Sequence, residues 1–264
     1  MQSMVMNTLS NLAFPSLTDE ECNEQLPLLQ QQLARLQIAL FQQKKRAVIV
    51  FEGTDAAGKG GAIRRMIHAM DPRGYRVYPI GPPSPAEAER HYLQRFWQRI
   101  PKNGQLGIFD RSWYGRVLVE RVEEFATERE WQRAYREIND FERLLVDDGI
   151  ILIKLFLHIS KEEQRERFTS RWTNPDKQWK LTPDDLKAHA KYDGYTEAFE
   201  EMFQRTSTGF GPWQIVPAND KDYARVTVLT KIIEGLSENI DLSDAIKPSD
   251  KMVKEVQQLL QIDP

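Results

Sequence analysis

A glycine-rich loop follows the first apolar run of the chain. Residues 53–61 are Gly-Thr-Asp-Ala-Ala-Gly-Lys-Gly-Gly, directly after the apolar residues 47–51. They match the Walker A pattern Gly-x-x-x-x-Gly-Lys, in which backbone N–H groups and the lysine surround phosphate oxygens. The setting between a predicted strand and a predicted helix favours a phosphate site over a chance match. We therefore predict phosphate binding by Gly53, Ala56, Ala57, Gly58, Lys59, Gly60 and Gly61.

The loop departs from the usual pattern at one position. Gly60 stands where a serine or threonine hydroxyl normally holds Mg²⁺ beside the phosphates. The metal then needs other oxygen ligands, and it commonly keeps several waters. Asp55 lies in the loop, and Asp110 ends the predicted strand 106–109 as a Walker B carboxylate does. We predict that Asp55 and Asp110 hold Mg²⁺, with a local turn bond for Asp55 and a helix N-cap for Asp110 as the alternatives.

Arginines close to these segments are candidate phosphate ligands, because a guanidinium group suits phosphate oxygens. Arg111 follows Asp110, and Arg116 and Arg121 lie on the next predicted helix, 113–124. Arg121 has Glu120 and Glu124 as alternative partners. Of the two arginines that follow the loop at 64 and 65, one is expected to face the phosphates, and we assign Arg64.

A second basic segment lies later in the chain. Residues 161–180 hold six basic residues and a proline, Pro175, in a polar region. Such a segment suits a lid that closes over phosphates and excludes water. We assign Arg171 and Lys180 to this lid, at about residues 165–190; a solvated helix face is the alternative.

Composition limits the other function classes. The 264 residues are 41% hydrophobic and 28% charged, with a net charge of −3, so a polyanion site needs positive charge gathered locally. Cys22 is the single cysteine, which excludes an intrachain disulfide and favours a cytoplasmic protein. No apolar run is long enough to cross a bilayer, and the N-terminus lacks the pattern of a signal peptide. We expect neither a membrane nor a nucleic-acid partner.

Apolar segments alternate with helical ones along the chain. Strands are predicted at 47–51, 75–80, 106–109, 150–159 and 213–216, with helices between them that include 58–70, 128–146, 183–205 and 218–236. This order predicts an α/β domain with a parallel five-stranded sheet flanked by helices. Thr18 and Glu21 form a capping box before a leucine-striped helix. We therefore divide the chain into a helical extension, 1–46, packed on a domain at 47–264.

Several of these segments together resemble the family-2 polyphosphate kinases. The resemblance rests on the loop 52–61, on Asp110-Arg111-Ser112-Trp113-Tyr114-Gly115-Arg116, on 160–164, on 205–208, on Pro212-Trp213 and on 218–221. It implies a P-loop kinase fold similar to thymidylate kinase, with a helical lid. It also implies Mg²⁺-dependent phosphoryl transfer between inorganic polyphosphate and a nucleotide, in a homo-oligomer, either a dimer or a tetramer. By this resemblance the catalytic positions are Asp55, Lys59, Asp110, Arg111 and Arg171.

Within the family, residues 109–122 and 137–142 are most similar to the polyphosphate:AMP phosphotransferases, many of which carry two copies of the domain. The resemblance implies that this chain is a single-domain member that converts AMP to ADP, with adenine or guanine nucleotides as substrates. The alternatives are transfer to ADP, the reverse synthesis of polyphosphate, and an ATP-using nucleoside monophosphate kinase. A regulatory module that binds nucleotide or polyphosphate without turnover is the non-enzyme alternative.

Overall fold

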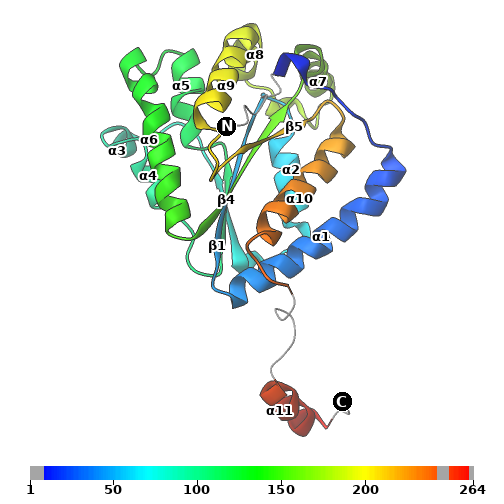
Figure 1. The fold of residues 1–264 in the computed structure, drawn as a ribbon. Helices are drawn as coiled ribbons and strands as arrows, with labels where there is room; N and C mark the ends of the chain where they lie inside the picture. Colours follow the sequence, from blue (N-terminus) through cyan, green and yellow to red (C-terminus); the bar gives the residue numbers. More distant parts are fainter. Residues whose placement is uncertain (1–8, 243–249, 262–264) are drawn as a thin grey trace.

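A five-stranded parallel sheet forms the centre of the molecule (Figure 1). The computed structural model describes residues 9–242 and 250–261. The strand order is β2-β3-β1-β4-β5. The strands are β1 Arg46–Gly53, β2 Tyr75–Pro79, β3 Leu106–Asp110, β4 Ile150–His158 and β5 Trp213–Pro217. The predicted α/β fold with five parallel strands is therefore confirmed.

Helices cover both faces of this sheet (Figure 1). One face packs against α1 Asp19–Gln42, α2 Lys59–Met66 and α10 Lys221–Ser237. The other packs against α4 Gln94–Trp97, the 3-10 helix η4 Trp113–Arg116, α6 Glu128–Asp147 and α9 Tyr192–Thr206. The remaining helices are η1 Leu9–Asn11, η2 Ile67–Ala69, η3 Pro72–Gly74, α3 Pro85–Ala88, α5 Val119–Val122, α7 Lys161–Thr173, η5 Gln178–Lys180, α8 Pro183–Ala190 and α11 Asp250–Leu260. No helix within the described ranges has the length and apolar character to span a bilayer.

The central strand β1 supplies both apolar cores. Its side chains alternate, so that Ile49 and Phe51 face the core beneath α1, α2 and α10, while Val48 and Val50 face the core beneath α6 and α9. All of these side chains are fully buried. This burial on both faces explains the continuous apolar character of the strand, which is typical of a parallel sheet.

Two helices that the sequence predicts as continuous are interrupted. The predicted helix 113–124 is a 3-10 turn, η4, followed by the short helix α5, with Leu118 in a non-helical conformation between them. The predicted helix 183–205 divides at Lys191 into α8 and α9. The first interruption follows from tertiary contacts, because the side chains of Trp113 and Tyr114 are held by Glu142 from α6. Local periodicity carries no information about such contacts.

The helix α1 is tied to the domain by Gln37. This side chain is buried, donates to the backbone carbonyl of Asp71 at 2.8 Å and accepts from the Asp71 N–H at 2.7 Å. The pair of bonds fixes the turn that leads into β2. The same helix contributes Leu33, Leu36 and Leu40 to the core that it shares with the sheet.

We expect Gln37→Ala to lower the free energy of unfolding by about 1–3 kcal/mol, because two hydrogen bonds are lost and a buried space is left. Chemical denaturation followed by circular dichroism measures the change. Gln32→Ala, at an exposed position of the same helix, is the matched control and should change stability by less than about 0.5 kcal/mol. Equal stabilities of the two variants would show that the Gln37 contacts contribute nothing.

Candidate active site

The phosphate loop lies between β1 and α2, as the sequence predicts. Gly53 begins it with φ 147°, and a Cβ atom at this position would lie 2.2 Å from the carbonyl oxygen of Leu157. Only glycine fits so close to the neighbouring strand. Gly58 caps α2 with φ 100°, so the backbone turns sharply before the helix begins. The N-terminus of α2 therefore points its free N–H groups into the loop, where an anion is favoured.

Lys59 and Gly60 determine what the loop offers to a ligand. The Lys59 ammonium donates to the carbonyl oxygens of Gly53, at 2.7 Å, and Thr54, at 3.2 Å. A Cβ atom at Gly60 would lie 3.9 Å from Asp110 Oδ2. The missing hydroxyl position thus faces a carboxylate that can take over its role toward a metal.

Asp55 and Arg111 form an ion pair across the site. Arg111 Nη2 lies 2.9 Å from Asp55 Oδ1. The Arg111 backbone has φ 65°, in the left-handed region, which costs a non-glycine residue about 1–2 kcal/mol. Its N–H donates to the carbonyl of Phe51 at 2.9 Å, so the end of β1 helps to hold this conformation. Such strain persists only where the surrounding structure fixes it, and it is frequent at functional sites.

Glu52 holds the segment after Arg111 through a buried hydrogen bond, and it was not predicted as a site residue from the sequence. Its side chain is only 5% exposed, and its Oε1 accepts from the Ser112 hydroxyl at 2.7 Å. Burial raises the pKa of Glu52, although the Ser112 hydrogen bond and the charges of Lys59 and Arg111 act in the opposite direction. Glu52 follows the apolar residues 47–51 directly. A carboxylate at that place was the signal in the sequence that could have marked it as a site residue.

Arg167 is a second residue that the sequence did not single out. It is 8% exposed and donates to the carbonyl oxygens of Ala56, at 2.9 Å, and of Ala218 and Asn219, at 2.6 and 2.8 Å. It therefore connects the phosphate loop with the segment after β5. Arg165 and Arg167 are both arginines of the same polar helical segment, and only the tertiary structure shows that Arg167 is the buried one.

A single cleft of about 960 Å³ brings most of the predicted residues together. Its lining includes the predicted residues Asp55, Ala56, Ala57, Gly58, Lys59, Gly60, Gly61, Asp110, Arg111, Arg171 and Lys180. Nine basic and three acidic residues line it, whereas the whole chain has a net charge of −3. The basic residues are Lys59, Arg65, Arg111, Arg167, Arg171, Lys177, Lys180, Lys221 and Arg225. Positive charge is therefore gathered in this cleft, which suits a polyanion.

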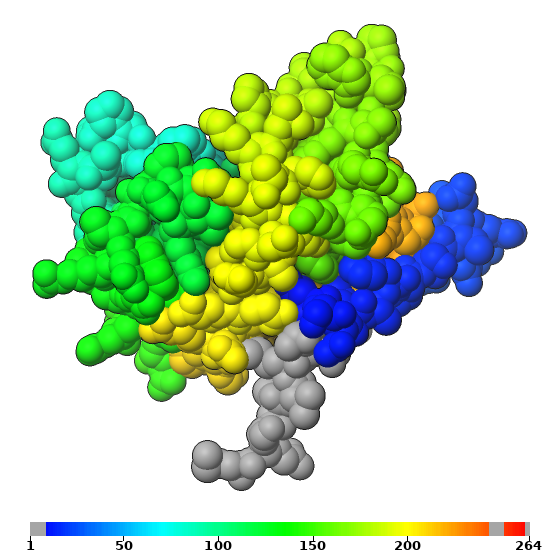
Figure 2. Space-filling view, turned by 90° about the horizontal axis from the view of Figure 1, so that it is seen from above, coloured from blue at the N-terminus to red at the C-terminus, as the bar shows by residue number. Residues whose placement is uncertain are grey.

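The predicted lid segment, about residues 165–190, contributes to one wall of the cleft and comprises most of α7 with η5 and α8. Figure 2 shows these yellow-green residues projecting beyond the neighbouring helices. Arg171 lies 3.8 Å from Asp185 and donates to the carbonyl of Lys180 at 3.2 Å. Trp179 lines the same wall and is 77% exposed.

Four predicted phosphate ligands do not line this cleft. Gly53 lines a smaller cavity of about 80 Å³ instead. The side chain of Arg64 is exposed, and its neighbour Arg65 lines the cleft in its place, because the two point to different sides of α2. Arg116 pairs with Glu120 at 3.1 Å and its guanidinium lies over the Tyr92 ring.

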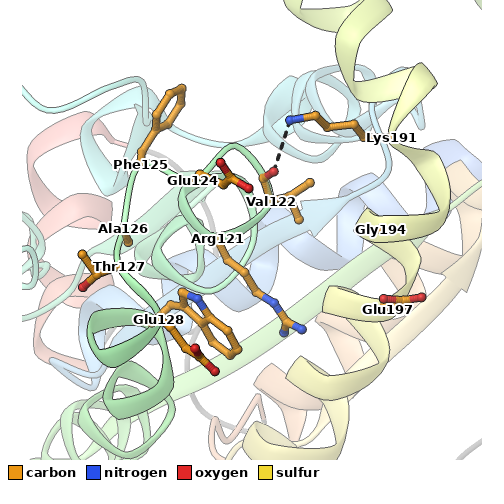
Figure 3. Close-up of a pocket in the computed structure, with 11 residues that line it drawn as sticks. Arg121, Val122, Glu124, Phe125, Ala126, Thr127, Glu128, Lys191, Gly194 and Glu197 are labelled. Atoms are coloured by element: carbon orange, nitrogen blue, oxygen red, sulfur yellow. Dashed lines mark hydrogen bonds between the residues drawn. The ribbon is translucent and has the colours of Figure 1, made fainter.

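Arg121 belongs to a different pocket, of about 740 Å³, between α5, α6 and α9 (Figure 3). Its guanidinium lies over the Trp131 ring and pairs with Glu201 at 2.7 Å. Neither Glu120 nor Glu124, its predicted alternative partners, forms this ion pair. Figure 3 also shows Lys191, which donates to the carbonyl of Val122 across the pocket.

The described residues contain no cluster of three or more metal-binding side chains. Asp55 and Asp110 both line the cleft, so a metal bound there would take its remaining ligands from phosphate oxygens and water. Mg²⁺ often binds in this way, through one or two carboxylates plus substrate phosphates. The donor set therefore fits Mg²⁺.

His158 closes the end of β4 beneath the loop. It is 4% exposed, and its Nδ1 lies 3.1 Å from the Thr54 hydroxyl. Burial lowers the pKa of His158 to about 4. The ordinary value is about 6.5, so between these pH values the unfolded chain binds a proton that the folded chain does not.

We expect this histidine to make the free energy of unfolding decrease as the pH is lowered. Its contribution is complete above about pH 6.5, is lost progressively toward pH 4 and amounts to at most about 3 kcal/mol. Urea unfolding at several pH values measures the slope. His158→Gln should flatten the slope in this window, whereas His68→Gln, at an exposed position, should leave it unchanged. An unaltered slope in His158→Gln would contradict the assignment.

Comparison with known proteins places this site in a family. The family model described as Polyphosphate kinase 2 (PPK2) matches residues 16–242. The polyphosphate:AMP phosphotransferase of Pseudomonas syringae pv. tomato is 52% identical over 189 residues, which are 72% of this chain and 38% of that protein. The polyphosphate:AMP phosphotransferase of Acinetobacter johnsonii is 44% identical over 240 residues, 91% of this chain and 50% of that protein. The chain thus spans half or less of the length of these two relatives.

Relatives at 41–44% identity carry other nucleotides in their names, which are ADP, GDP, or AMP together with ADP. Among solved structures, the polyphosphate kinase 2 of Arthrobacter aurescens superimposes with a TM-score of 0.89 at 32% identity and covers 98% of this chain and 94% of its own. The sequence match over most of the chain, the shared fold and the phosphate loop agree: the chain belongs to the polyphosphate kinase 2 family.

Proposed function

We propose that the chain transfers a phosphoryl group from inorganic polyphosphate to AMP and so produces ADP. The observation that carries this proposal is the excess of positive charge in the cleft, where nine basic residues face three acidic ones. The basic residues lie on the phosphate loop and α2, after β3, on the predicted lid and on α10. A long linear polyanion fits such a lining better than a single nucleotide does.

Two parts of the cleft lining differ in character. Pro79, Ile80 and Gly81, after β2, form an uncharged part of the lining, while the lid contributes Arg171, Lys177 and Lys180. We assign the nucleoside to the uncharged part and the polyphosphate chain to the basic one. Asp110 and Arg111 then lie between donor and acceptor, at the end of the strand β3 that neighbours β2.

The reaction needs positioning and neutralisation of charge more than proton transfer. The acceptor oxygen belongs to a nucleotide phosphate that is already anionic, so it attacks without a strong base. Lys59 and the loop N–H groups hold the phosphates, and Arg111 and Arg171 flank the transferred group. The lid excludes water, which otherwise competes as acceptor. Asp55, paired with Arg111, keeps that guanidinium directed at the transfer point.

Mg²⁺ is proposed as the cofactor. When bound, it offsets the negative charge that the donor and acceptor phosphates bring together. Asp110 is its first candidate ligand, because Gly60 leaves space beside Asp110 Oδ2, and Asp55 is the second. The homo-oligomer and the cytoplasmic setting remain predictions.

AMP is proposed as acceptor because the two relatives described above are named for it. Purified protein should form ADP when it is incubated with Mg²⁺, long-chain polyphosphate and AMP, with products separated by chromatography. Removal of divalent cations with EDTA should stop the reaction. Lys59→Met should lower the rate by about a hundredfold or more without loss of the fold, because the charge at the transfer point is removed.

The other outcomes are equally informative. If ATP is formed from ADP and nothing is formed from AMP, the acceptor is ADP and polyphosphate is still the donor. Transfer from ATP, with none from polyphosphate, identifies an ordinary nucleoside monophosphate kinase and overturns the proposal. Binding of polyphosphate without transfer from either donor identifies a regulatory module. A near-normal rate in Lys59→Met would place the reacting phosphates elsewhere.

Arg65 and Arg64 offer a matched pair of variants for the donor site. Burial and the nearby charges of Arg225 and Arg64 lower the pKa of Arg65, and both Arg65 and Arg225 line the cleft. Arg65→Met should raise the KM for polyphosphate by about fivefold and change kcat little, because one partly exposed phosphate contact is lost. Arg64→Met removes the same charge from an exposed position and should leave both constants unchanged. Equal effects of the two variants would mean that only the overall charge of α2 matters.

A further inference from the structure

A fully buried ion pair lies behind the active site. The side chains of Lys154, on β4, and Glu142, on α6, have no exposed surface, and Lys154 Nζ lies 2.8 Å from Glu142 Oε2. Lys154 interrupts a strand that is otherwise apolar up to its last residue. The reaction proposed above uses neither residue, and both lie in the core rather than in the cleft.

Every donor of this pair has a partner. The Lys154 ammonium donates to the Tyr114 hydroxyl at 2.9 Å, to Glu142 and to the carbonyl of Thr206 at 2.8 Å. Glu142 Oε1 accepts from the Tyr114 hydroxyl at 2.7 Å and from the Trp113 indole N–H at 3.1 Å. A fully satisfied buried network of this kind fixes the orientation of its members.

Stability alone does not explain a buried pair. Well-packed apolar residues of similar volume in place of such a pair often leave stability unchanged or increase it, because two charges no longer have to be desolvated. Burial works against both charges, since it raises the pKa of Glu142 and lowers that of Lys154. The directional bonds to Trp113 and Tyr114 are what an apolar core lacks.

These bonds act on the segment that carries Arg111. Trp113 and Tyr114 follow Arg111 by two and three residues. Ser112, between Arg111 and Trp113, donates a hydrogen bond to Glu52. Arg111 itself has the left-handed backbone conformation with φ 65°. The segment 111–114 is therefore fixed by contacts from β1, α6 and β4, while the Arg111 guanidinium, paired with Asp55, lines the cleft.

We propose that Glu142 and Lys154 are positioning residues that hold Arg111 for phosphoryl transfer through Trp113 and Tyr114. The inference rests on the proposed function, because it takes Arg111 as a group that contacts the transferred phosphate. Neither residue lines the cleft.

A double-mutant cycle tests this inference. The paired replacement Glu142→Leu with Lys154→Met is combined with Arg111→Lys, and kcat and KM are measured with saturating AMP. The paired replacement alone should lower kcat by about tenfold to a hundredfold, because small misplacements at a reacting centre are costly. Its KM for polyphosphate should change by less than about threefold, since the other basic residues of the cleft remain in place.

In the Arg111→Lys background, the same paired replacement should lower kcat by no more than about threefold, because contacts that act through Arg111 are not additive with its loss. An equal factor in both backgrounds would overturn the inference, and so would an unchanged kcat in the paired variant. Ile138→Val, a core change on α6 outside the network, controls for loosening of the core and should leave kcat unchanged.

If the paired variant does not fold, Tyr114→Phe provides the second test. It removes the hydroxyl that bonds to both Glu142 and Lys154 and keeps the aromatic ring. Its loss of kcat should likewise disappear in the Arg111→Lys background, and persistence of the loss there would overturn the inference.

The proposed function can fail separately. If the unmodified protein transfers phosphate to neither AMP nor ADP, that function is wrong, and the same cycle is measured as affinity for tripolyphosphate by calorimetry. The paired replacement should then weaken binding only when Arg111 is present. Equal weakening in both backgrounds would overturn the positioning role.

Discussion

Hydrogen bonding of β1 along both of its edges is the constraint on which the rest of the site depends. Phe51 is in register with Asp110 of β3, and Gly53 is in register with Leu157 of β4. Parallel strands end at one edge of the sheet, so the loops that follow them meet there. The phosphate loop and the Asp110-Arg111 pair are therefore adjacent because their strands are adjacent. The apolar residues of β1, buried on both faces, stabilise this arrangement.

Several cations in one cleft repel each other, and the chain limits this repulsion locally. Arg171 has Asp185 nearby, Arg225 pairs with Asp222, and Arg111 pairs with Asp55. Lys59 binds backbone carbonyls. The cleft is thus folded and charged before any ligand arrives, which reduces the reorganisation that phosphate binding requires. Intrinsic repulsion among the remaining cations favours an anion in the cleft.

The sequence predicted the parts of the site that depend on local pattern. The loop, the strands and Asp110 followed from apolar runs and glycine spacing, and the structure places them together in the cleft. Arg65 lines the cleft in place of the predicted Arg64, because the choice between them depends on which side of α2 faces the cleft. The break after Trp113 and Tyr114 was missed because its cause, Glu142, lies on another helix.

Buried polar residues were the harder class to predict. Glu52 and Arg167 hold the loops of the site through buried contacts. Glu52 was signalled in the sequence only by its place after an apolar strand, and Arg167 resembles an ordinary surface charge of a helix. The partner of Glu52 is the Ser112 hydroxyl, and the partners of Arg167 are backbone carbonyls far along the chain. No rule of residue spacing identifies such partners. Helix type and strand order are local or statistical properties, whereas these contacts exist only in the assembled structure.

The bonds between α7 and the phosphate loop also limit where the predicted lid segment can have a hinge. Gln164 donates to the carbonyl of Asp55 at 3.1 Å, and Arg167 donates to that of Ala56. The first half of α7 is thereby fastened to the loop and behaves as part of the rigid frame. Any hinge that leaves the loop undisturbed must lie beyond Arg167, so the moving arm is shorter than the helical segment itself. Arg171, one turn further on, is the first basic residue of the cleft wall that such an arm carries.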